Sequence, residues 1–408
     1  MSIESTIRIF TALLIFPLQA TRFIFQPSPA RERQYLALLV TQIAVVCRLK
    51  SDAPDSAFLC GFLTTLMSLR LLPTLTWEQP PDVADHRSTD PENRDIADQS
   101  TVDKFLWGFS WMTTLRGIPW NWRAKNVPPQ PPYASRWDYL VKNVPVVFAY
   151  GCVLDVLWKM RVLFNFTKYH GGLEGYGSSA SQGVGPMVVN SVFAIVSMYV
   201  TTVFNYQMMA VVAIAIGISG PEDWPPILGP VREAYSLRNF WARTWHQLFR
   251  NIFEKYGRAL VFIFGFEQRG ARAHNVTRFL AFVISGLIHA IPIAGMPFPR
   301  GIPKDKNTPY RGSDQMVFFI IHAILCFVEE RFSIFYRSVR GDGPSRNFEL
   351  FLGYIWVAAC MVFTSRYLFD EMELSGINDK TEVVPWSIVA ILEALLGQKL
   401  FDKRLSSR

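Results

Sequence analysis

Long apolar segments recur along the chain and alternate with short polar stretches. A helix needs roughly 17 to 25 mostly apolar residues to cross the ~30 Å of hydrocarbon in a bilayer. Candidate spans of this kind lie near residues 5–25, 34–49, 56–76, 138–164, 187–219, 277–297, 315–336, 349–369 and 384–400. The pattern therefore predicts an all-α, polytopic membrane helical bundle with about nine crossings, within a range of about eight to ten.

Three apolar segments need separate interpretation. The run at 187–219 is long enough for one strongly tilted helix, or for a helix followed by a re-entrant piece. Residues 259–266 are too short to cross alone, and they fit a segment that enters and leaves on one side where protein shields its backbone. The first apolar run lacks a small-x-small cleavage site and is followed directly by more spans, so we expect a retained span rather than a signal peptide.

Composition supports a bilayer environment, because half of the residues are apolar, 14% are aromatic and only 18% are charged. The net charge of +8 does not indicate nucleic acid, since the Lys and Arg residues lie in short loops rather than in one continuous stripe. That distribution favours lipid headgroups or an anionic cosubstrate. The five cysteines lie in or beside apolar segments without metal-ligand or disulfide spacing, so we expect packing residues and no metal site.

Loop charges predict the orientation of the bundle. Residues 77–136 carry seven Lys or Arg and residues 220–258 carry six, which is typical of cytosolic loops. Residues 165–186 carry one Lys and begin with the sequon Asn165-Phe-Thr, which is typical of a glycosylated lumenal loop. The loop 297–314 is the exception, because alternation places it in the lumen although it carries four Lys or Arg. We expect a lumenal N-terminus and a cytosolic C-terminus in the endoplasmic reticulum.

The chain divides into three parts by composition. Residues 1–76 hold N-terminal spans, residues 77–136 form a cytosolic loop, and residues 137–408 hold the remaining spans. Within the loop, residues 77–103 are acidic and Pro-rich and lack apolar periodicity, which predicts a mobile segment with a solvated His86.

The segment FWARTWHQLFR (240–250) combines charged, imidazole and aromatic side chains. Placed on a helix, its polar side chains gather on one side and its large apolar side chains on the other. The polar side holds Asn239, Arg243, His246 and Arg250, and the apolar side holds Trp241, Trp245, Leu248 and Ile252. Two interpretations stay open: an interfacial anchor whose arginines contact lipid phosphates, or a face that binds an anionic substrate.

The segment SGLIHA (285–290) places His289 within an otherwise apolar span. A buried imidazole is costly there unless it is used or satisfied, so His289 is a functional candidate. Ser285 lies one turn earlier on the same face, and Gly286 permits close approach of a helix or ligand. The alternative is a structural histidine bonded across the bundle. For the other intramembrane histidine, His322, a structural pairing with Glu329 is favoured.

These residue types suit acyl transfer. A histidine with a near-neutral pKa can take the proton from an alcohol that attacks an activated acyl carbon, and a nearby donor can hold the developing oxyanion. The chain has no GxSxG elbow, which favours direct transfer over a covalent acyl-enzyme. Cytosolic arginines would suit the phosphates of coenzyme A.

Three motifs together resemble the membrane-bound O-acyltransferase superfamily, in particular its wax-synthase-like fungal branch. They are RGIPWNW (116–122), FWARTWHQLFR and SGLIHA, and the resemblance covers the chain from about residue 100 onward. It implies that His289 is the general base and that His246 stands where many members carry Asn or Asp. It also implies that Arg116 and Trp120 help to line the cytosolic mouth of a tunnel, although interfacial anchoring by these residues is equally compatible with the sequence.

The resemblance implies that residues 137–408 form a wax-synthase-like acyltransferase core. It also implies a helical bundle around a reaction tunnel, which is open to coenzyme A from the cytosol and to a lipophilic hydroxylated acceptor from the bilayer. We therefore expect an acyl-CoA:alcohol O-acyltransferase that moves acetyl from acetyl-CoA to a terpenoid or meroterpenoid hydroxyl, without a permanently bound cofactor. The acetyl and terpenoid parts rest on what related fungal enzymes commonly do. A long-chain wax or sterol ester synthase is the first alternative, and a transporter or other non-enzymatic membrane protein is the second.

Overall fold

A computed structural model describes residues 3–49, 54–81, 85–86, 96–164, 183–296, 311–339, 346–374, 387–397 and 400. The described part is helical and contains no strand. Clustering of contacts divides the chain into two compact units. Unit 1 comprises residues 1–125 and 247–335, and unit 2 comprises residues 126–246 and 336–408. The predicted division at residues 76 and 136 stays a prediction.

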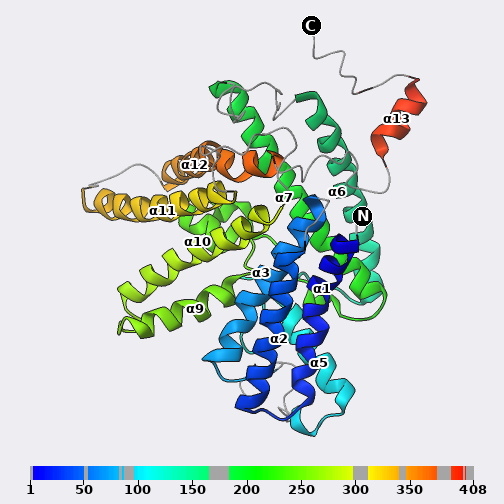
Figure 1. The fold of residues 1–408 in the computed structure, drawn as a ribbon. Coiled ribbons are helices and arrows are strands. Elements are labelled where there is room, and N and C mark those ends of the chain that lie inside the picture. The colour runs from blue at the N-terminus through cyan, green and yellow to red at the C-terminus, as the bar shows by residue number, and fades with distance from the viewer. Residues whose placement is uncertain are drawn as a thin grey trace. The chain divides into compact units, whose positions relative to one another are not determined.

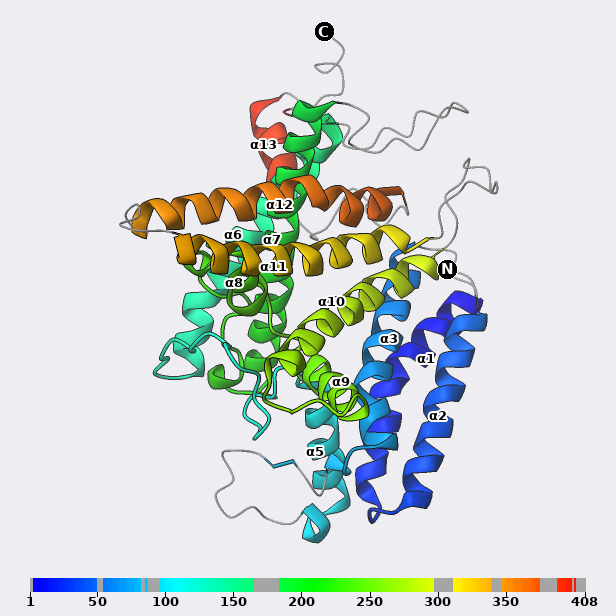
Figure 2. The same cartoon turned by 90° about the vertical axis from the view of Figure 1, so that its left-hand side faces the viewer.

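Unit 1 is built from long helices around an apolar core (Figure 1). Its helices are α1 (Ile3–Ala20), α2 (Pro29–Arg48), α3 (Pro54–Thr76), α5 (Thr101–Thr113), α9 (Arg250–Ile263), α10 (Ala271–Ala294) and most of α11 (Ser313–Val339). Short 3-10 turns lie at Thr21–Ile24 and Ile96–Asp98. Helices α1, α2 and α3 pack against one another, as Figure 2 shows, and α10 packs against both α3 and α9.

Local sequence explains several of the helix ends. Pro29 occupies the first turn of α2, and the Ser28 hydroxyl accepts a hydrogen bond of 3.1 Å from the Arg31 amide. Ser100 caps α5 in the same way, through the Asp103 amide at 3.2 Å. Each cap satisfies an amide that the first helical turn would otherwise leave without a partner.

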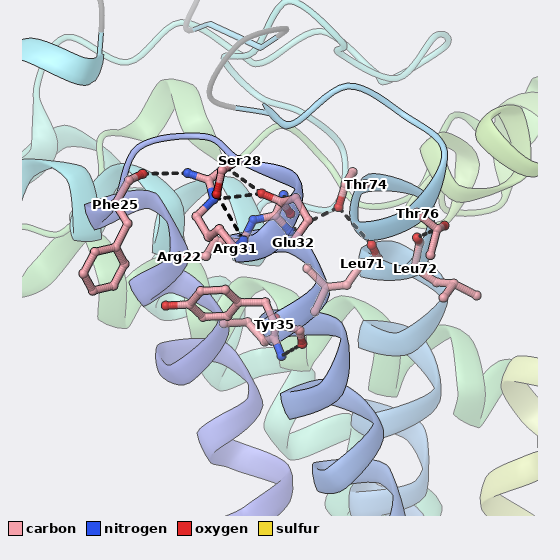
Figure 3. Close-up of polar contacts among 11 residues, drawn as sticks. Arg22, Phe25, Ser28, Arg31, Glu32, Tyr35, Leu71, Leu72, Thr74 and Thr76 are labelled. Atoms are coloured by element: carbon pink, nitrogen blue, oxygen red, sulfur yellow. Dashed lines mark hydrogen bonds and ion pairs between the residues drawn. The ribbon is translucent and has the colours of Figure 1, made fainter.

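Buried charges join the N-terminal helices of unit 1 (Figure 3). Arg22 is fully buried, and its Nη2 lies 3.2 Å from Oε2 of Glu32 on α2. Its Nη1 lies 3.4 Å from the Thr74 hydroxyl on α3. Arg31 also contacts Glu32, and it donates to the carbonyl of Phe25 at 2.6 Å. A buried charge is tolerated when it is paired and hydrogen-bonded, so these contacts connect the end of α1 to both neighbouring helices.

Unit 2 contains α6 (Arg136–Phe164), α7 (Val184–Ala215), α8 (Leu237–Asn239), the π-helical turn η6 (Phe240–Thr244), α12 (Arg346–Leu374) and α13 (Ile388–Leu396). The 3-10 turns at Pro221–Asp223 and Val231–Glu233 also belong to it. Helix α7 packs against α6 and α12. Helix α13 is held to α6 by Asp155, whose carboxylate accepts hydrogen bonds from the Ser387 hydroxyl at 2.9 Å and the Val389 amide at 3.0 Å.

Six of the described helices are long and apolar enough to cross a bilayer, which confirms a polytopic all-α protein. They lie at Ile3–Ile24, Ser56–Thr76, Arg136–Met160, Val184–Ala215, Ala271–Ala294 and Asn347–Met372. The predicted spans at 34–49 and 315–336 are helices, but they are not among these six candidate spans. The described part of α13 has nine residues, or roughly 14 Å at 1.5 Å per residue, which is shorter than the hydrocarbon layer. The total of about nine crossings stays a prediction.

The segments that needed separate interpretation now have definite structures. Residues 187–215 belong to a single continuous helix of 32 residues, α7, rather than to a helix and a re-entrant piece. Residues 259–263 are the last turns of α9, and Gly265 makes the turn toward α10 with a φ of 66°. The run at 259–266 is therefore the end of an amphipathic helix and the turn that follows, rather than a separate element.

Candidate functional site

His289 lies on α10 in unit 1, half-buried, with its imidazole held from two sides. Its Nδ1 lies 2.7 Å from the carbonyl oxygen of Ser285, one turn earlier. The Phe319 ring of α11 lies 4.9 Å from the imidazole between centroids, at an interplanar angle of 39°. The sequence predicted that Ser285 lies one turn before His289, and the hydrogen bond between them uses the Ser285 backbone carbonyl.

The Ser285 contact determines which ring nitrogen of His289 carries the proton. A carbonyl oxygen only accepts hydrogen bonds, so Nδ1 must be the donor. In a neutral imidazole with a protonated Nδ1, Nε2 carries a free lone pair. The described geometry thus leaves Nε2 able to accept a proton.

Gly286 provides the close helix contact that the sequence predicted. A Cβ atom at this position would lie 2.6 Å from Sδ of Met316 on α11. Such a distance is far below a normal contact between side chains, so a larger residue here would displace the Met316 side chain.

The segment 239–250 is not one helix, and this corrects the sequence-based prediction. Helix α8 ends at Asn239, η6 covers Phe240–Thr244, and the backbone is extended at Trp245 with a ψ of 156°. Helix α9 begins only at Arg250. The expected polar face of Asn239, Arg243, His246 and Arg250 is therefore not a helical face.

Tertiary hydrogen bonds explain why the helix is interrupted. The Asn126 side chain donates to the carbonyl of Ala242 at 2.9 Å, and the Gly229 amide donates to the carbonyl of Thr244 at 2.8 Å. Glycine is required there, because a Cβ at Gly229 would lie 1.9 Å from the carbonyl oxygen of Arg243. These two hydrogen bonds replace those of a regular helix. Their donors, Asn126 and Gly229, lie outside the segment, so a helical pattern within it does not reveal them.

Within unit 2, the turn η6 gathers an aromatic group beside His246. The Phe240 and Trp245 rings stack with centroids 5.9 Å apart, and Trp241 meets Phe240 edge-on at 5.1 Å. The His246 imidazole lies 5.2 Å from the Trp245 ring. Single-turn π-helical segments occur frequently at functional sites, which keeps this group a candidate.

The polar residues of this motif have local partners. The backbone N–H of Asn239 donates a hydrogen bond of 3.1 Å to the Ser236 hydroxyl. Arg243 is exposed and pairs with Glu233 at 3.2 Å. Arg250 belongs to unit 1, where it donates to Glu254 at 2.9 Å and to Gln247 at 3.1 Å. Asn239, Arg243 and His246 thus lie in unit 2, while Arg250 and His289 lie in unit 1.

The RGIPWNW motif forms a compact turn in unit 1. Arg116 is buried, and Trp120 is only 1% exposed within the apolar core, edge-on to Trp107 at 4.9 Å. The Ile118–Pro119 peptide is cis, and Gly117 has a φ of 65° with no room for a Cβ beside Trp122. Both predicted residues therefore support the loop from inside, rather than anchoring it at an exposed interface.

A group of charges beside this turn was not identified from the sequence. Glu78 pairs with Lys255 and, at 3.3 Å, with Arg258. Asp85 accepts a hydrogen bond of 2.7 Å from the Trp111 indole. Burial raises the pKa of Asp85 and lowers the pKa of Lys255. The segment 77–103 was predicted to be mobile, but Asp85 within it is hydrogen-bonded to Trp111, which lies outside the segment. The loop is therefore anchored at Asp85.

Other predicted residues have simpler outcomes. His86 is exposed, as expected, although its ring nitrogen lies 3.2 Å from the Asn121 side chain. His322 is fully buried beside Phe318 at 4.5 Å, and its pairing with Glu329 stays a prediction. Asn165 lies outside the described residues. The five cysteines, all among the described residues, form no disulfide, and Cys60, Cys326 and Cys360 are buried packing residues. Within the described chain, no group of His, Cys, Asp or Glu could hold a metal ion.

Comparison with known proteins confirms the resemblance that the motifs predicted. Residues 224–321, which contain FWARTWHQLFR and SGLIHA, match the profile of the membrane bound O-acyl transferase family. Acetyltransferase eriL of Hericium erinaceus is 28% identical over 302 residues, covering 73% of this chain and 74% of its own. Acetyltransferase atnC of Arthrinium sp is 24% identical over 337 residues, covering 78% and 73%. O-Mevalon transferase yanI of Aspergillus niger is 27% identical over 332 residues, covering 74% and 70%.

These similarities and the apolar helices define the class of protein. The chain is an integral membrane acyltransferase, and its residues 224–321 are similar to the membrane bound O-acyl transferase family. An acyltransferase requires an acyl donor and an acceptor. The alternative of a transporter or non-enzymatic membrane protein is therefore set aside.

Proposed function

We propose that the chain transfers an acetyl group from acetyl-CoA to a hydroxyl group of a lipophilic terpenoid or meroterpenoid, a secondary metabolite, in the membrane of the endoplasmic reticulum. The names of eriL and atnC support an acetyl donor, because both are acetyltransferases. The yanI relative is instead named an O-mevalon transferase, so the names of the relatives do not agree on one transferred group. The choice of acetyl is therefore part of the proposal. The apolar surroundings of His289 support a lipophilic acceptor, since such a molecule can reach an intramembrane residue from the bilayer.

The observation that carries the proposal is the hydrogen bond from Nδ1 of His289 to the Ser285 carbonyl. It leaves Nε2 free to take a proton, which is the property that a general base needs. Neutral histidine within an apolar span is otherwise costly to bury, so a catalytic role accounts for its presence.

The proposed reaction is a direct transfer. Nε2 of His289 removes the proton of the acceptor hydroxyl while the oxygen attacks the thioester carbonyl carbon. The new C–O bond forms, the C–S bond breaks, and the coenzyme A sulfur leaves with the electron pair. The imidazolium then returns the proton to that sulfur, so the products are the ester and coenzyme A, and His289 is neutral again.

The second motif is the proposed site for the donor. Its candidates for contact with acyl-CoA are Asn239, Trp241, Arg243, Trp245 and Arg250, with Ser285 beside the base. Exposed Arg243 could exchange Glu233 for a phosphate, because surface ion pairs contribute little free energy. For His246 three roles remain in the proposal: polarising the acyl carbonyl, orienting the acceptor, or supporting the turn. Arg116 and Trp120, being buried, would act by holding the adjacent loop.

The proposal is tested with purified protein, acetyl-CoA and a panel of hydroxylated terpenoid acceptors. His289→Ala should lower ester formation by at least ~100-fold, the smallest usual contribution of a general base. His274→Ala, at an exposed position near the start of the same helix, is the matched control and should keep full activity. Full ester formation by folded His289→Ala would refute the general-base assignment.

A long-chain wax or sterol ester synthase would use the same base and carrier site. Acetyl-CoA and palmitoyl-CoA should therefore be offered in parallel to the same protein. Preference for acetyl-CoA is the expected outcome, and a clear preference for palmitoyl-CoA would replace the proposed acetyl transfer with long-chain esterification.

A further inference from the structure

Helix α11 lies antiparallel to α10 and contacts it at three levels around His289. Arg278 and Glu330 form an ion pair at 2.5 Å. Closer to the histidine, a Cβ at Gly286 would lie 2.6 Å from Met316 Sδ. On the far side of it, Gly312 precedes α11 with a φ of 90°, and a Cβ there would lie 2.5 Å from the Ala290 carbonyl oxygen. Figure 2 shows the two helices lying next to one another.

This arrangement explains how Phe319 reaches the imidazole. Side chains on a helix lean toward the N-terminus of that helix. In an antiparallel pair, His289 therefore leans back toward Gly286 while Phe319 leans back toward Met316, so the two rings converge. Since Gly286 has no side chain, nothing stands between them, and the centroids are 4.9 Å apart.

One hydrogen bond does not fix an imidazole by itself. Rotation of a histidine ring about χ2 is broad, and the Ser285 contact restrains mainly the position of Nδ1. A second contact on the ring face is needed to hold Nε2 in one direction. Phe319 provides it, and it is itself only 4% exposed and packed edge-on against Phe318 at 5.0 Å.

We propose that Phe319 is a positioning residue for the reaction, which acts by holding the His289 ring so that Nε2 stays directed at the acceptor hydroxyl. This rests on the proposed general-base role of His289. Because a small displacement of a catalytic group slows chemistry far more than it weakens binding, loss of Phe319 should lower kcat and leave KM for the acyl donor almost unchanged.

Phe319→Met is the principal variant, because methionine fills much of the volume without a ring. Phe319→Tyr keeps the ring and should restore activity. Phe318→Met is the matched control, since Phe318 is 1% exposed on the same helix and its ring contacts Phe319 and His322. We expect kcat to fall about 10-fold in Phe319→Met with KM within about twofold, and kcat of Phe318→Met to stay within about threefold of the parent.

A second measurement does not depend on turnover. Carbethoxylation by diethyl pyrocarbonate at His289, followed by peptide mass spectrometry, reports how freely the neutral ring nitrogen is reached. Phe319→Met should accelerate this modification several-fold, whereas Phe318→Met and Phe319→Tyr should not. If Phe319→Met and Phe318→Met lost kcat and thermal stability equally, Phe319 would be a packing residue and not a positioning residue.

The two proposals fail in different ways. Unchanged kcat and carbethoxylation in Phe319→Met would overturn the positioning role while leaving acyl transfer by His289 intact. If the parent protein transferred no acyl group, the proposed function would fail, and the carbethoxylation contrast would still decide whether Phe319 holds the ring.

Discussion

At the scale of single residues, Asp85 is a carboxyl group whose ionisation the fold opposes. Burial raises its pKa above the usual 3.8, although the Trp111 indole, Lys255 and Arg70 act in the opposite direction and Glu78 adds to the rise. A group with a raised folded-state pKa stabilises the protein below its unfolded pKa, and that contribution is lost as pH increases through the folded-state value. Ionised Asp85 is therefore a cost near neutral pH.

Asp85→Asn should remove this cost and keep an acceptor for the indole. The melting temperature of the variant relative to the parent should therefore increase as the pH is raised from about 4 to about 7. Differential scanning fluorimetry in detergent measures it. Glu267→Gln, which changes an exposed carboxylate, is the control variant measured over the same pH range. A difference for Asp85→Asn that stays constant or decreases with pH would contradict the assignment.

At the scale of helices, the α10 and α11 pair depends on small residues. Gly286→Leu would force a branched side chain into Met316, and overpacking of this kind typically costs ~1–3 kcal/mol. It should also separate Phe319 from His289, so ester formation should fall together with the melting temperature. Both are measured on the purified variant.

Gly185→Leu is the control for that substitution, because a Cβ at this helical glycine meets nothing within 4 Å. It should leave stability and activity near those of the parent. Equal losses in the two variants would show that helix propensity, rather than the contact with α11, determines the effect.

The sequence predicted long helices well and the conformation of short motifs poorly. A run such as Val184–Ala215 is helical because its own residues favour it and the bilayer demands it. The turn Phe240–Thr244 depends instead on Asn126 and Gly229, which reach its carbonyls from outside the segment. No periodicity within 239–250 contains that information.

The candidate site shows the same contrast between residues placed by local sequence and residues placed by tertiary contacts. His289, Ser285 and Gly286 lie within one turn, so their relation could be read from a helical pattern. Phe319 lies on another helix, and its place beside the imidazole follows only from the antiparallel contact at Gly286. Periodicity identifies residues that share a face, but it does not identify which residue of a neighbouring helix will meet them.

At the scale of the whole molecule, orientation in the membrane connects the motifs to the cytosolic supply of acyl-CoA. Helix α7 is one continuous candidate span, so the segments before and after it lie on opposite sides of a bilayer that it crosses once. Asn165 precedes α7, and the segment with Asn239 to His246 follows it. If Asn165 lies in the lumen, the segment from Asn239 to His246 must therefore face the cytosol.

Glycosylation tests this orientation directly. Expressed in a eukaryotic host, the protein should migrate faster after treatment with endoglycosidase H, and Asn165→Gln should abolish that shift. Asn275→Gln is the matched control, because its Asn-Val-Thr sequon opens α10 on the expected cytosolic side and should not be used. If Asn275→Gln alone abolished the shift, α10 would begin in the lumen. The basic loop 220–258 would then lie on the lumenal side, and an acyl-CoA donor could not reach the motif from the cytosol.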